Sequence, residues 1–186
     1  MNFRIESSAL ISSAFSNHGI SDFQQACDFI KNLAYRRNGN RKDSLCVFTD
    51  LGGTCSTKHA VLKRLADENG CTDIKLMLGI FKMNQVNTPK VASVLDKFGI
   101  QEMPEAHNYL KIDDKILDCT RRNSSAADFE NDLLLEIEIT PEQIADFKVD
   151  FQRKFLDRYL EENDEIKYDT EEFWKIREVC IAALQK

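Results

Sequence analysis

The sequence lacks the features that identify membrane, secreted or zinc-binding proteins. It contains no run of about 18 apolar residues, which is the length that a membrane-spanning helix needs. The first residues do not show the positive charge followed by an apolar run that marks a signal peptide. No two of the six cysteines are spaced as CxxC, so no zinc site is predicted. We therefore expect a cytoplasmic protein with reduced thiols and without a metal or other cofactor.

Positive charge is also in short supply. The chain has 25 Lys and Arg against 31 Asp and Glu, which gives a formal net charge of −6. This balance disfavours a general role in binding nucleic acid or anionic membranes. The 186 residues, 42% of them hydrophobic, contain no repeat, low-complexity tract or linker. We expect a single domain over residues 1–186, with one sizeable core.

Cys55 is placed where local structure favours a reactive thiol. Two glycines end an irregular stretch, and a helix is predicted from there to about Asn69, with Thr54 as its N-cap and Gly70 after its end. Cys55 then stands in the first turn, where unpaired N–H groups and the helix dipole stabilise a thiolate. The alternative is a buried free cysteine that behaves as a small hydrophobic residue.

Histidine is scarce, and one of the three histidines begins a predicted hairpin. The strands of this hairpin are 107–112 and 115–119, with a tight turn at 113–114. Since the arms of a hairpin lie side by side, His107 and Asp118 are expected to come close together. An acid beside an imidazole fixes its tautomer and stabilises the imidazolium. Taken singly, the histidine reads as a half-buried strand residue and the aspartate as a surface carboxylate.

The three features together resemble a known family. Gly-Thr-Cys at 53–55 opening a helix, a histidine on a strand and Asp-Cys-Thr at 118–120 ending the next strand are similar to the transglutaminase-like superfamily. This superfamily belongs with the papain-like cysteine enzymes and includes crosslinking enzymes, bacterial proteases and peptide N-glycanases. The resemblance implies Cys55 as nucleophile, His107 as base and Asp118 as the residue that orients the base.

The resemblance covers roughly residues 45–120 and has two departures. Tyr109 stands where an aromatic residue, usually Trp, follows the family histidine, and Cys119 stands where Pro or Ala often follows the aspartate. The spelling Gly-Gly-x-Cys at 52–55 also resembles arylamine N-acetyltransferases, which share the order of the triad. Leu51 occupies the place of their usual arginine. A third alternative is an inactive scaffold of this fold that binds a peptide or a partner protein.

Two neighbours of the cysteine complicate the assignment of the base. His59 lies four residues after Cys55, so the two side chains share one helix face, but it has no visible orienting acid. We therefore prefer His107 as the base. Lys58 and His59 are instead expected to raise the local positive potential and lower the pKa of Cys55.

Two further features bear on substrate binding. The loop 36–42 carries four positive charges; we read it as a solvated loop, with an anionic substrate as the alternative. The backbone N–H of Cys55 is expected to help hold an oxyanion. Candidates for a second oxyanion donor are Gln24, Gln25 and Asn108.

We expect an α+β fold in which a small antiparallel sheet packs on the Cys55 helix, with additional helices at both ends of the chain. The expected function is thiol-dependent acyl transfer or hydrolysis of a peptide, protein or small amide, without nucleic-acid or membrane partners. Helices are predicted at 21–37, 55–69, 89–98 and 141–162 and from residue 169 or 170 onward. Strands are predicted at 74–83, 107–112, 115–119 and 133–139. The chain beyond the segment that resembles the family is expected to form a C-terminal helical extension.

Overall fold

The computed structural model describes residues 1–184 and shows an α+β fold. A four-stranded antiparallel sheet has the order β5-β4-β3-β6, and β1 and β2 form a small parallel sheet. This confirms the fold class that the sequence predicted. The strands are β1 Ala34–Tyr35, β2 Gly52–Gly53, β3 Lys75–Asn84, β4 Glu102–Ile112, β5 Lys115–Leu117 and β6 Leu133–Ile139.

Helices make up the rest of the regular structure. None of those in the described part of the chain is long and apolar enough to cross a membrane. The α-helices are α1 Leu10–Asn17, α2 Phe23–Asn32, α3 Cys46–Thr49, α4 Cys55–Glu68, α5 Ala92–Phe98, α6 Asp146–Glu161 and α7 Thr170–Ala183, and the short 3-10 helices are η1 Pro89–Val91, η2 Ala126–Asp128, η3 Glu130–Asp132 and η4 Pro141–Ile144.

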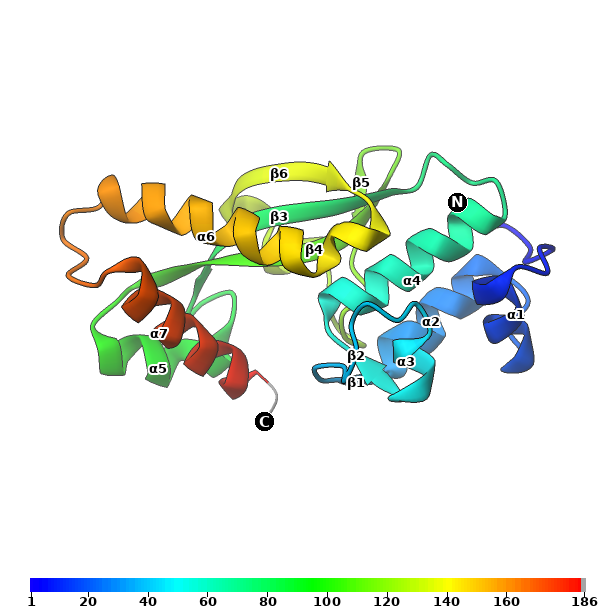
Figure 1. Ribbon diagram of the computed structural model, residues 1–186, viewed down its shortest axis with the longest axis horizontal. Coiled ribbons are helices and arrows are strands. Elements are labelled where there is room, and N and C mark those ends of the chain that lie inside the picture. The colour runs from blue at the N-terminus through cyan, green and yellow to red at the C-terminus, as the bar shows by residue number, and fades with distance from the viewer. Residues whose placement is uncertain (185–186) are drawn as a thin grey trace. The chain divides into compact units, whose positions relative to one another are not determined.

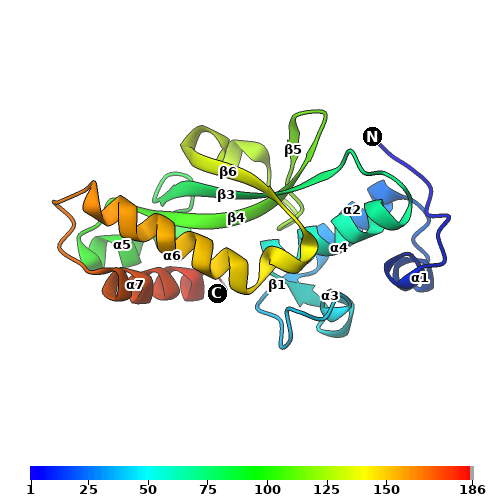
Figure 2. The ribbon, with the colours of Figure 1, turned by 45° about the horizontal axis from the view of Figure 1, so that its top comes forward.

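The chain divides into two compact units, each assembled from several segments. The first unit consists of Met1–Leu78, His107–Ala126 and Ile137–Ala145, and the remaining residues form the second. In the first unit α4 packs against α1, α2, α3 and η4 (Figure 1). In the second unit α7 lies beside both α5 and α6 (Figure 2). Cys55, His107 and Asp118 all belong to the first unit.

Helix α4 is the central element of the first unit. Its predicted apolar face is buried, and so is a row of polar side chains in its first two turns. A helix that buries polar groups on one side and apolar groups on the other must find hydrogen-bond partners for the former. The apolar residues are Ala60, Val61, Leu62, Leu65 and Ala66, and the polar ones are Ser56, Thr57, Lys58 and His59.

The predicted hairpin is present with a two-residue turn. Ile112 pairs with Lys115, and Asp113 and Asp114 both adopt left-handed backbone conformations, with φ of 48° and 60°. Two left-handed residues at the centre of a hairpin form a type I′ turn, whose twist matches that of the paired strands. Aspartate adopts this conformation more readily than most residues. The hairpin register is therefore fixed by the turn.

Several helix boundaries differ from the prediction. Helix α2 is capped by Asp22, whose side chain accepts a hydrogen bond from the Gln25 N–H, and not by Ser21. It ends at Asn32, because the next residues extend to form β1. The predicted helix 141–162 is interrupted at Ala145, which has φ of −102° and ψ of −104°. Helix α1 was not predicted, because five polar or small residues dilute its apolar pattern.

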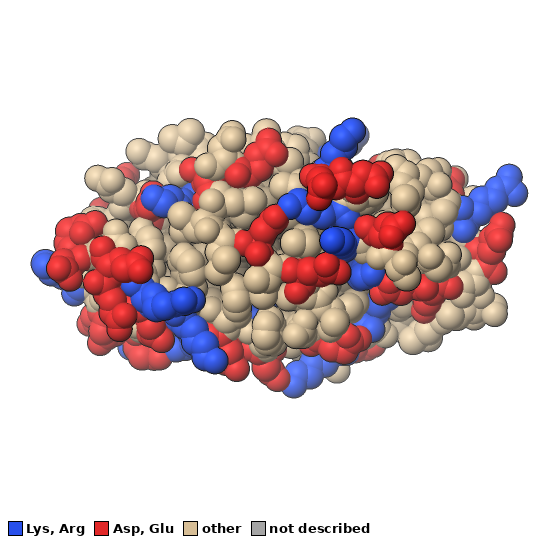
Figure 3. Space-filling view, turned by 90° about the horizontal axis from the view of Figure 1, so that it is seen from above, with Lys and Arg blue, Asp and Glu red and all other residues tan. Residues whose placement is uncertain are grey.

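Charged side chains of both signs are interspersed in small groups on the face shown in Figure 3. Two ion pairs of the first unit are Lys63–Asp67 and Arg64–Glu142, whose atoms approach to 2.6 and 2.8 Å. Exposed pairs of this kind contribute at most about 1 kcal/mol each. The stability of the fold must therefore come mainly from its buried contacts.

The close packing of β1 against β2 gives a prediction for the glycine pair. A Cβ atom on Gly52 would lie 2.9 Å from the backbone oxygen of Ala34, whereas one on Gly39 would meet nothing within 4 Å. Gly52→Ala is expected to destabilise the protein by about 1–3 kcal/mol, because backbone must move. Gly39→Ala should stay within about 0.5 kcal/mol of the parent. Thermal unfolding measures both, and equal melting temperatures would contradict the packing of β1 on β2.

Candidate active site

Cys55 is positioned by the parallel pairing of β1 with β2. Tyr35 pairs with Gly53, and the chain then turns directly into α4. Leu51, just before the glycine pair, has a left-handed φ of 50°, which costs a non-glycine residue on the order of 1 kcal/mol. The thiol of Cys55 is the first side chain of the helix, and the residue keeps 6% of its surface exposed. The helix start therefore holds Cys55 as a buried residue with little remaining exposure.

A hydrogen-bond network holds this helix start. The predicted cap, Thr54, is confirmed: its N–H donates to Oγ1 of Thr57 at 3.2 Å in a capping box. The Thr57 hydroxyl donates in turn to Oδ1 of Asn38 at 2.7 Å. The amide of Asn38 also donates to the Gly52 carbonyl and to Asp50, both at 2.9 Å. Sequence reasoning missed Asn38, because nothing in the pattern indicates that a loop asparagine reaches these distant backbone groups.

His107 and Asp118 lie in contact, as predicted. Nε2 of His107 is 3.0 Å from Oδ2 of Asp118. The register explains this, because Leu110 opposes Leu117 and the alternation of side chains then puts residues 107 and 118 on the same face of the hairpin. The other carboxylate oxygen accepts a hydrogen bond from the Thr120 N–H at 2.7 Å. Both oxygens of Asp118 are thus engaged in a site where the residue is only 5% exposed.

The charges at this site strongly perturb the ionisation of His107 and Asp118. Burial lowers the pKa of His107, but the negative charges of Asp118 and Cys55 and the hydrogen bonds to both outweigh it and raise this pKa to about 10. Burial opposes ionisation of Asp118 as well, yet the charge and hydrogen bond of His107 bring the pKa of the carboxyl well below its usual range. His107 therefore interacts with both Asp118 and Cys55. The structure therefore brings all three predicted residues together.

His59 has a different role from the one that the sequence left open. Its Nε2 accepts the Cys119 N–H at 2.7 Å, and its Nδ1 lies 2.8 Å from the Cys55 carbonyl oxygen. A backbone N–H can only donate and a carbonyl can only accept, so His59 is the neutral tautomer with its proton on Nδ1. Both nitrogens of this fully buried ring are occupied by backbone. The ring connects the Cys55 turn to the segment after β5 and has no nitrogen left to serve as a base.

Lys58 is completely buried beside the triad. Its Nζ donates to the carbonyl oxygens of Leu33 at 2.6 Å and Thr120 at 2.9 Å. Burial, followed by the charge of Arg121, lowers the pKa of Lys58 to about 8. Lys58 is therefore a buried cation one turn from Cys55, whereas His59, as the neutral tautomer, does not add the positive charge that we expected of it.

The expected second oxyanion donors are engaged elsewhere. Asn108 points to the buried side of β4: its amide donates to the Met77 carbonyl at 2.9 Å, and its oxygen accepts from the Ser56 hydroxyl at 2.9 Å. Gln24 and Gln25 are exposed on α2 and bond to Asp28 and to the Ser21 N–H. Of the donors that the sequence suggested, the backbone N–H of Cys55 is the one that lies at the start of α4.

The segment after β5 contains a buried group without a partner. The Thr120 hydroxyl has no hydrogen bond within the described residues, although its neighbours Asp118 and Lys58 are fully engaged. Next to it, Cys119 is buried with Cys27 of α2 as a hydrogen-bond partner, and that bond together with burial raises the pKa of Cys27 well above its usual range. Such a thiol is inert at neutral pH. In the described chain, no cluster of three or more His, Cys, Asp or Glu is arranged to hold a metal ion.

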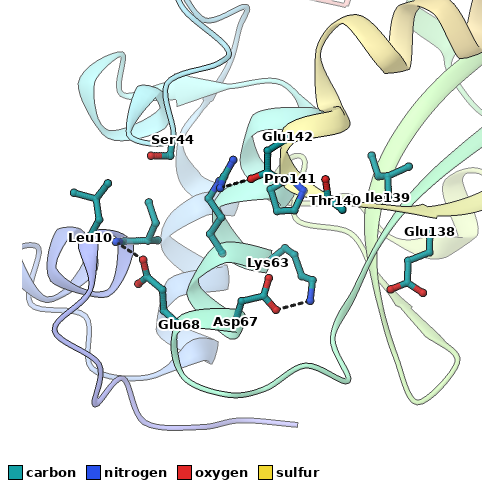
Figure 4. A pocket seen from close by; sticks show the side chains of 12 residues that line it. Leu10, Ser44, Lys63, Asp67, Glu68, Glu138, Ile139, Thr140, Pro141 and Glu142 are labelled. Atoms are coloured by element: carbon teal, nitrogen blue, oxygen red, sulfur yellow. Dashed lines mark hydrogen bonds and ion pairs between the residues drawn. The ribbon is translucent and has the colours of Figure 1, made fainter.

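A separate hollow of about 550 Å³ lies along the second half of α4 (Figure 4). Four of its charged side chains are paired with one another, Lys63 with Asp67 and Arg64 with Glu142, and Glu138 lies 3.7 Å from the Lys75 ammonium. Glu68 is occupied as well, since its carboxylate accepts hydrogen bonds from the N–H groups of Ile11 and Ser12 in the first turn of α1. The hollow therefore presents satisfied charges and has none of the reactive groups of the Cys55 site.

Comparisons of this chain with models of protein families, with curated proteins and with solved structures find no match in any of the three. The resemblance to the transglutaminase-like superfamily therefore stays a prediction from the motif residues.

The raised pKa of His107 predicts how its contribution to stability varies with pH. A proton held more tightly in the folded state stabilises it fully below the unfolded pKa of about 6.5, and this contribution disappears as the pH rises to about 10. The difference in unfolding free energy between the parent and His107→Ala should therefore shrink by on the order of 2 kcal/mol from pH 6 to pH 10. Chemical denaturation at each pH measures it. A difference that is constant over this range would contradict the charged contact.

The unpaired hydroxyl of Thr120 predicts a stabilising substitution. Thr120→Val keeps the shape and removes a buried polar group without a partner, so we expect a gain of about 1 kcal/mol and a melting temperature higher by roughly 2–4 °C. Thr57→Val is the matched control, because its hydroxyl bonds both Asn38 and Thr54 and its loss should destabilise. The same sign for both variants would refute the assignment.

Proposed function

We propose that this protein is a thiol-dependent enzyme that transfers or hydrolyses acyl groups from amides, with Cys55, His107 and Asp118 as its catalytic residues. The observation that carries the proposal is the position of His107 between Asp118, at 3.0 Å from Nε2, and Cys55, which also interacts with the ring. A histidine so placed can hold the imidazolium that accompanies a thiolate.

Each residue has a defined step. The Cys55 thiolate attacks the amide carbonyl, and the N–H at the start of α4 stabilises the oxyanion. His107 gives its proton to the leaving amine, and the thioester that remains is taken up by water or by a second amine. Asp118 keeps Nε2 protonated and leaves Nδ1 facing the sulfur. A peptide, protein or small amide is the substrate class of this chemistry.

The same measurements separate this proposal from an inactive binding scaffold. In a scaffold, the thiol keeps the ordinary pKa near 8.5 and reacts accordingly. An arylamine acetyltransferase would use the same three residues, so it differs in the acyl group and acceptor and not in the reactivity of Cys55.

The first test is the pH dependence of alkylation by iodoacetamide. Cys55 should react at a nearly constant rate between pH 5 and 8, whereas Cys71, which is more exposed, should lose about tenfold per pH unit below its pKa. Around pH 6.5 Cys55 should lead by several-fold, since the larger thiolate fraction is partly offset by lower nucleophilicity. Mass spectrometry of peptides after brief labelling gives both rates. Parallel profiles for the two cysteines would sink the proposal.

His107→Ala should return Cys55 to the profile of a free thiol, while His59→Ala should act mainly on stability because it leaves two backbone groups unpaired. The opposite result would assign the base to His59: a free-thiol profile in a folded His59→Ala protein, together with a rate that stays nearly constant between pH 5 and 8 (the plateau) in His107→Ala.

The second test compares the aspartates of the hairpin. Asp118→Asn should abolish the plateau, because the imidazolium loses its counter-charge, and loss of an orienting acid can cost about 10⁴ in rate in a related triad. Asp113→Asn and Asp114→Asn are the controls, since both occupy left-handed turn positions that accept Asn. Thermal unfolding checks the fold of each variant. A plateau retained in Asp118→Asn but lost in either turn variant would require the triad to be reassigned.

A further inference from the structure

Cationic side chains gather in two segments that border the site, although the chain as a whole has a negative net charge. Residues 33–42 contain four Lys and Arg and no carboxylate, and residues 118–122 contain two arginines beside Asp118. The whole chain has a formal net charge of −6. The positive charge around Cys55 is therefore a local feature.

The first segment runs alongside the glycine pair that precedes the nucleophile. The backbone N–H of Arg36 donates to the Gly53 carbonyl at 3.2 Å, two residues before Cys55. The Arg36 side chain covers Gly52, since a Cβ on that glycine would stand 2.9 Å from Nε. An exposed guanidinium is thereby held next to the turn that presents the sulfur.

The second segment is joined to the first by Lys58. Its Nζ bonds the carbonyl of Leu33 on one side and that of Thr120 on the other, so the two segments meet at a single ammonium group. The guanidinium of Arg121 lies 4.2 Å from the centre of the Tyr35 ring, which steadies it by a cation–π contact. Arg121 is thus placed across from the residue that precedes Arg36.

The positive charges of these segments affect a buried group of the site. The charge of Arg121 contributes to the lowered pKa of Lys58, which lies one turn from Cys55. Two carboxylates lie near these cations: Asp118, which contacts His107, and Asp50, whose pKa is lowered by hydrogen bonds from Asn38 and Gly39 at 2.9 and 3.1 Å and by the charge of Arg36. The Lys and Arg residues of the two segments, together with Lys58, outnumber these two carboxylates. An incoming anion would meet an excess of positive charge.

We propose that the Cys55 site selects acyl donors that carry a carboxylate next to the reacting carbonyl, as in an acidic peptide, with Arg36 and Arg121 as its cationic partners. The inference rests on the proposed function, and it extends it by naming the substrate class. Of the two interpretations of the 36–42 loop, a solvated loop or a binding site for an anionic substrate, we choose the second, because the first residue of the loop is held beside the proposed nucleophile.

Two alkylating agents of nearly equal size test the proposal. Iodoacetate carries a carboxylate beside the reacting carbon, and iodoacetamide carries a neutral amide in the same place. The ratio of the iodoacetate rate to the iodoacetamide rate at Cys55 should exceed the ratio at Cys71 in the same sample by roughly three- to tenfold at low ionic strength, and should shrink in 0.5 M salt.

Arg36→Gln and Arg121→Gln should each lower the Cys55 ratio, whereas Arg64→Gln should leave it unchanged, because Arg64 lies in the same helix as Cys55 but is paired with Glu142. A pair of peptidyl vinyl sulfones that differ only in Glu or Gln beside the warhead extends the test to a probe of substrate size, and the Glu probe should react faster. Melting temperatures confirm that each variant is folded.

The outcomes distinguish the two proposals. A plateau for iodoacetamide with equal ratios at Cys55 and Cys71, or equal rates for the two sulfones, overturns the carboxylate preference and leaves the thiol chemistry standing. A free-thiol profile at Cys55 overturns the proposed function and the substrate class with it.

Discussion

The buried ammonium of Lys58 is the interaction on which the geometry of the site depends. Its two hydrogen bonds tie α4 to the segment that enters β1 and to the segment that follows β5, which carry the cationic residues and Asp118 respectively. A buried cation is costly, and the lowered pKa of Lys58 expresses that cost. The contribution of Lys58 to stability varies with pH in the opposite direction to that of His107. The cost of burying its charge lowers the stability of the fold below about pH 8, and this cost is relieved as the pH rises toward 10.5. A site that retains such a group gains a fixed arrangement of three segments and some positive potential in return.

Helix α4 organises the site through one stripe of residues. Cys55, Lys58 and His59 stand at i, i+3 and i+4, so all three project from one side, toward the segment after β5. Cys55 begins the helix, while the other two side chains form the hydrogen bonds that hold Cys119 and Thr120, the neighbours of Asp118. The spacing that made His59 a rival base is the same spacing that lets it bridge the Cys55 carbonyl and the Cys119 N–H. A histidine with both nitrogens committed to backbone acts as a structural connector.

The features that the sequence predicted depend on patterns among neighbouring residues. The turn at Asp113 and Asp114 set the hairpin register, and that register decided that His107 and Asp118 share a face. The bounds of β6 and the cap of α4 also came from local pattern. The rest depended on contacts between distant segments: the complete burial of Lys58, the reach of Asn38 and the loss of Asn108 as an oxyanion donor all follow from tertiary packing. No pattern in the neighbouring residues distinguishes a lysine that bonds two carbonyls from one that faces solvent.

The contrast between the charge of the chain and the charge of its site shows why net charge constrains function only weakly. At physiological ionic strength, exposed charges are screened beyond about 8 Å. The acidic excess spread over the rest of the surface therefore contributes little at Cys55, where Arg36, Arg121 and Lys58 are held by backbone pairing, ring stacking and burial. Under the two proposals, the same cations would stabilise the thiolate and attract an anionic acyl donor. Activation of the nucleophile and selection of the substrate would then have one electrostatic origin, so removing a single arginine should alter both in the same direction.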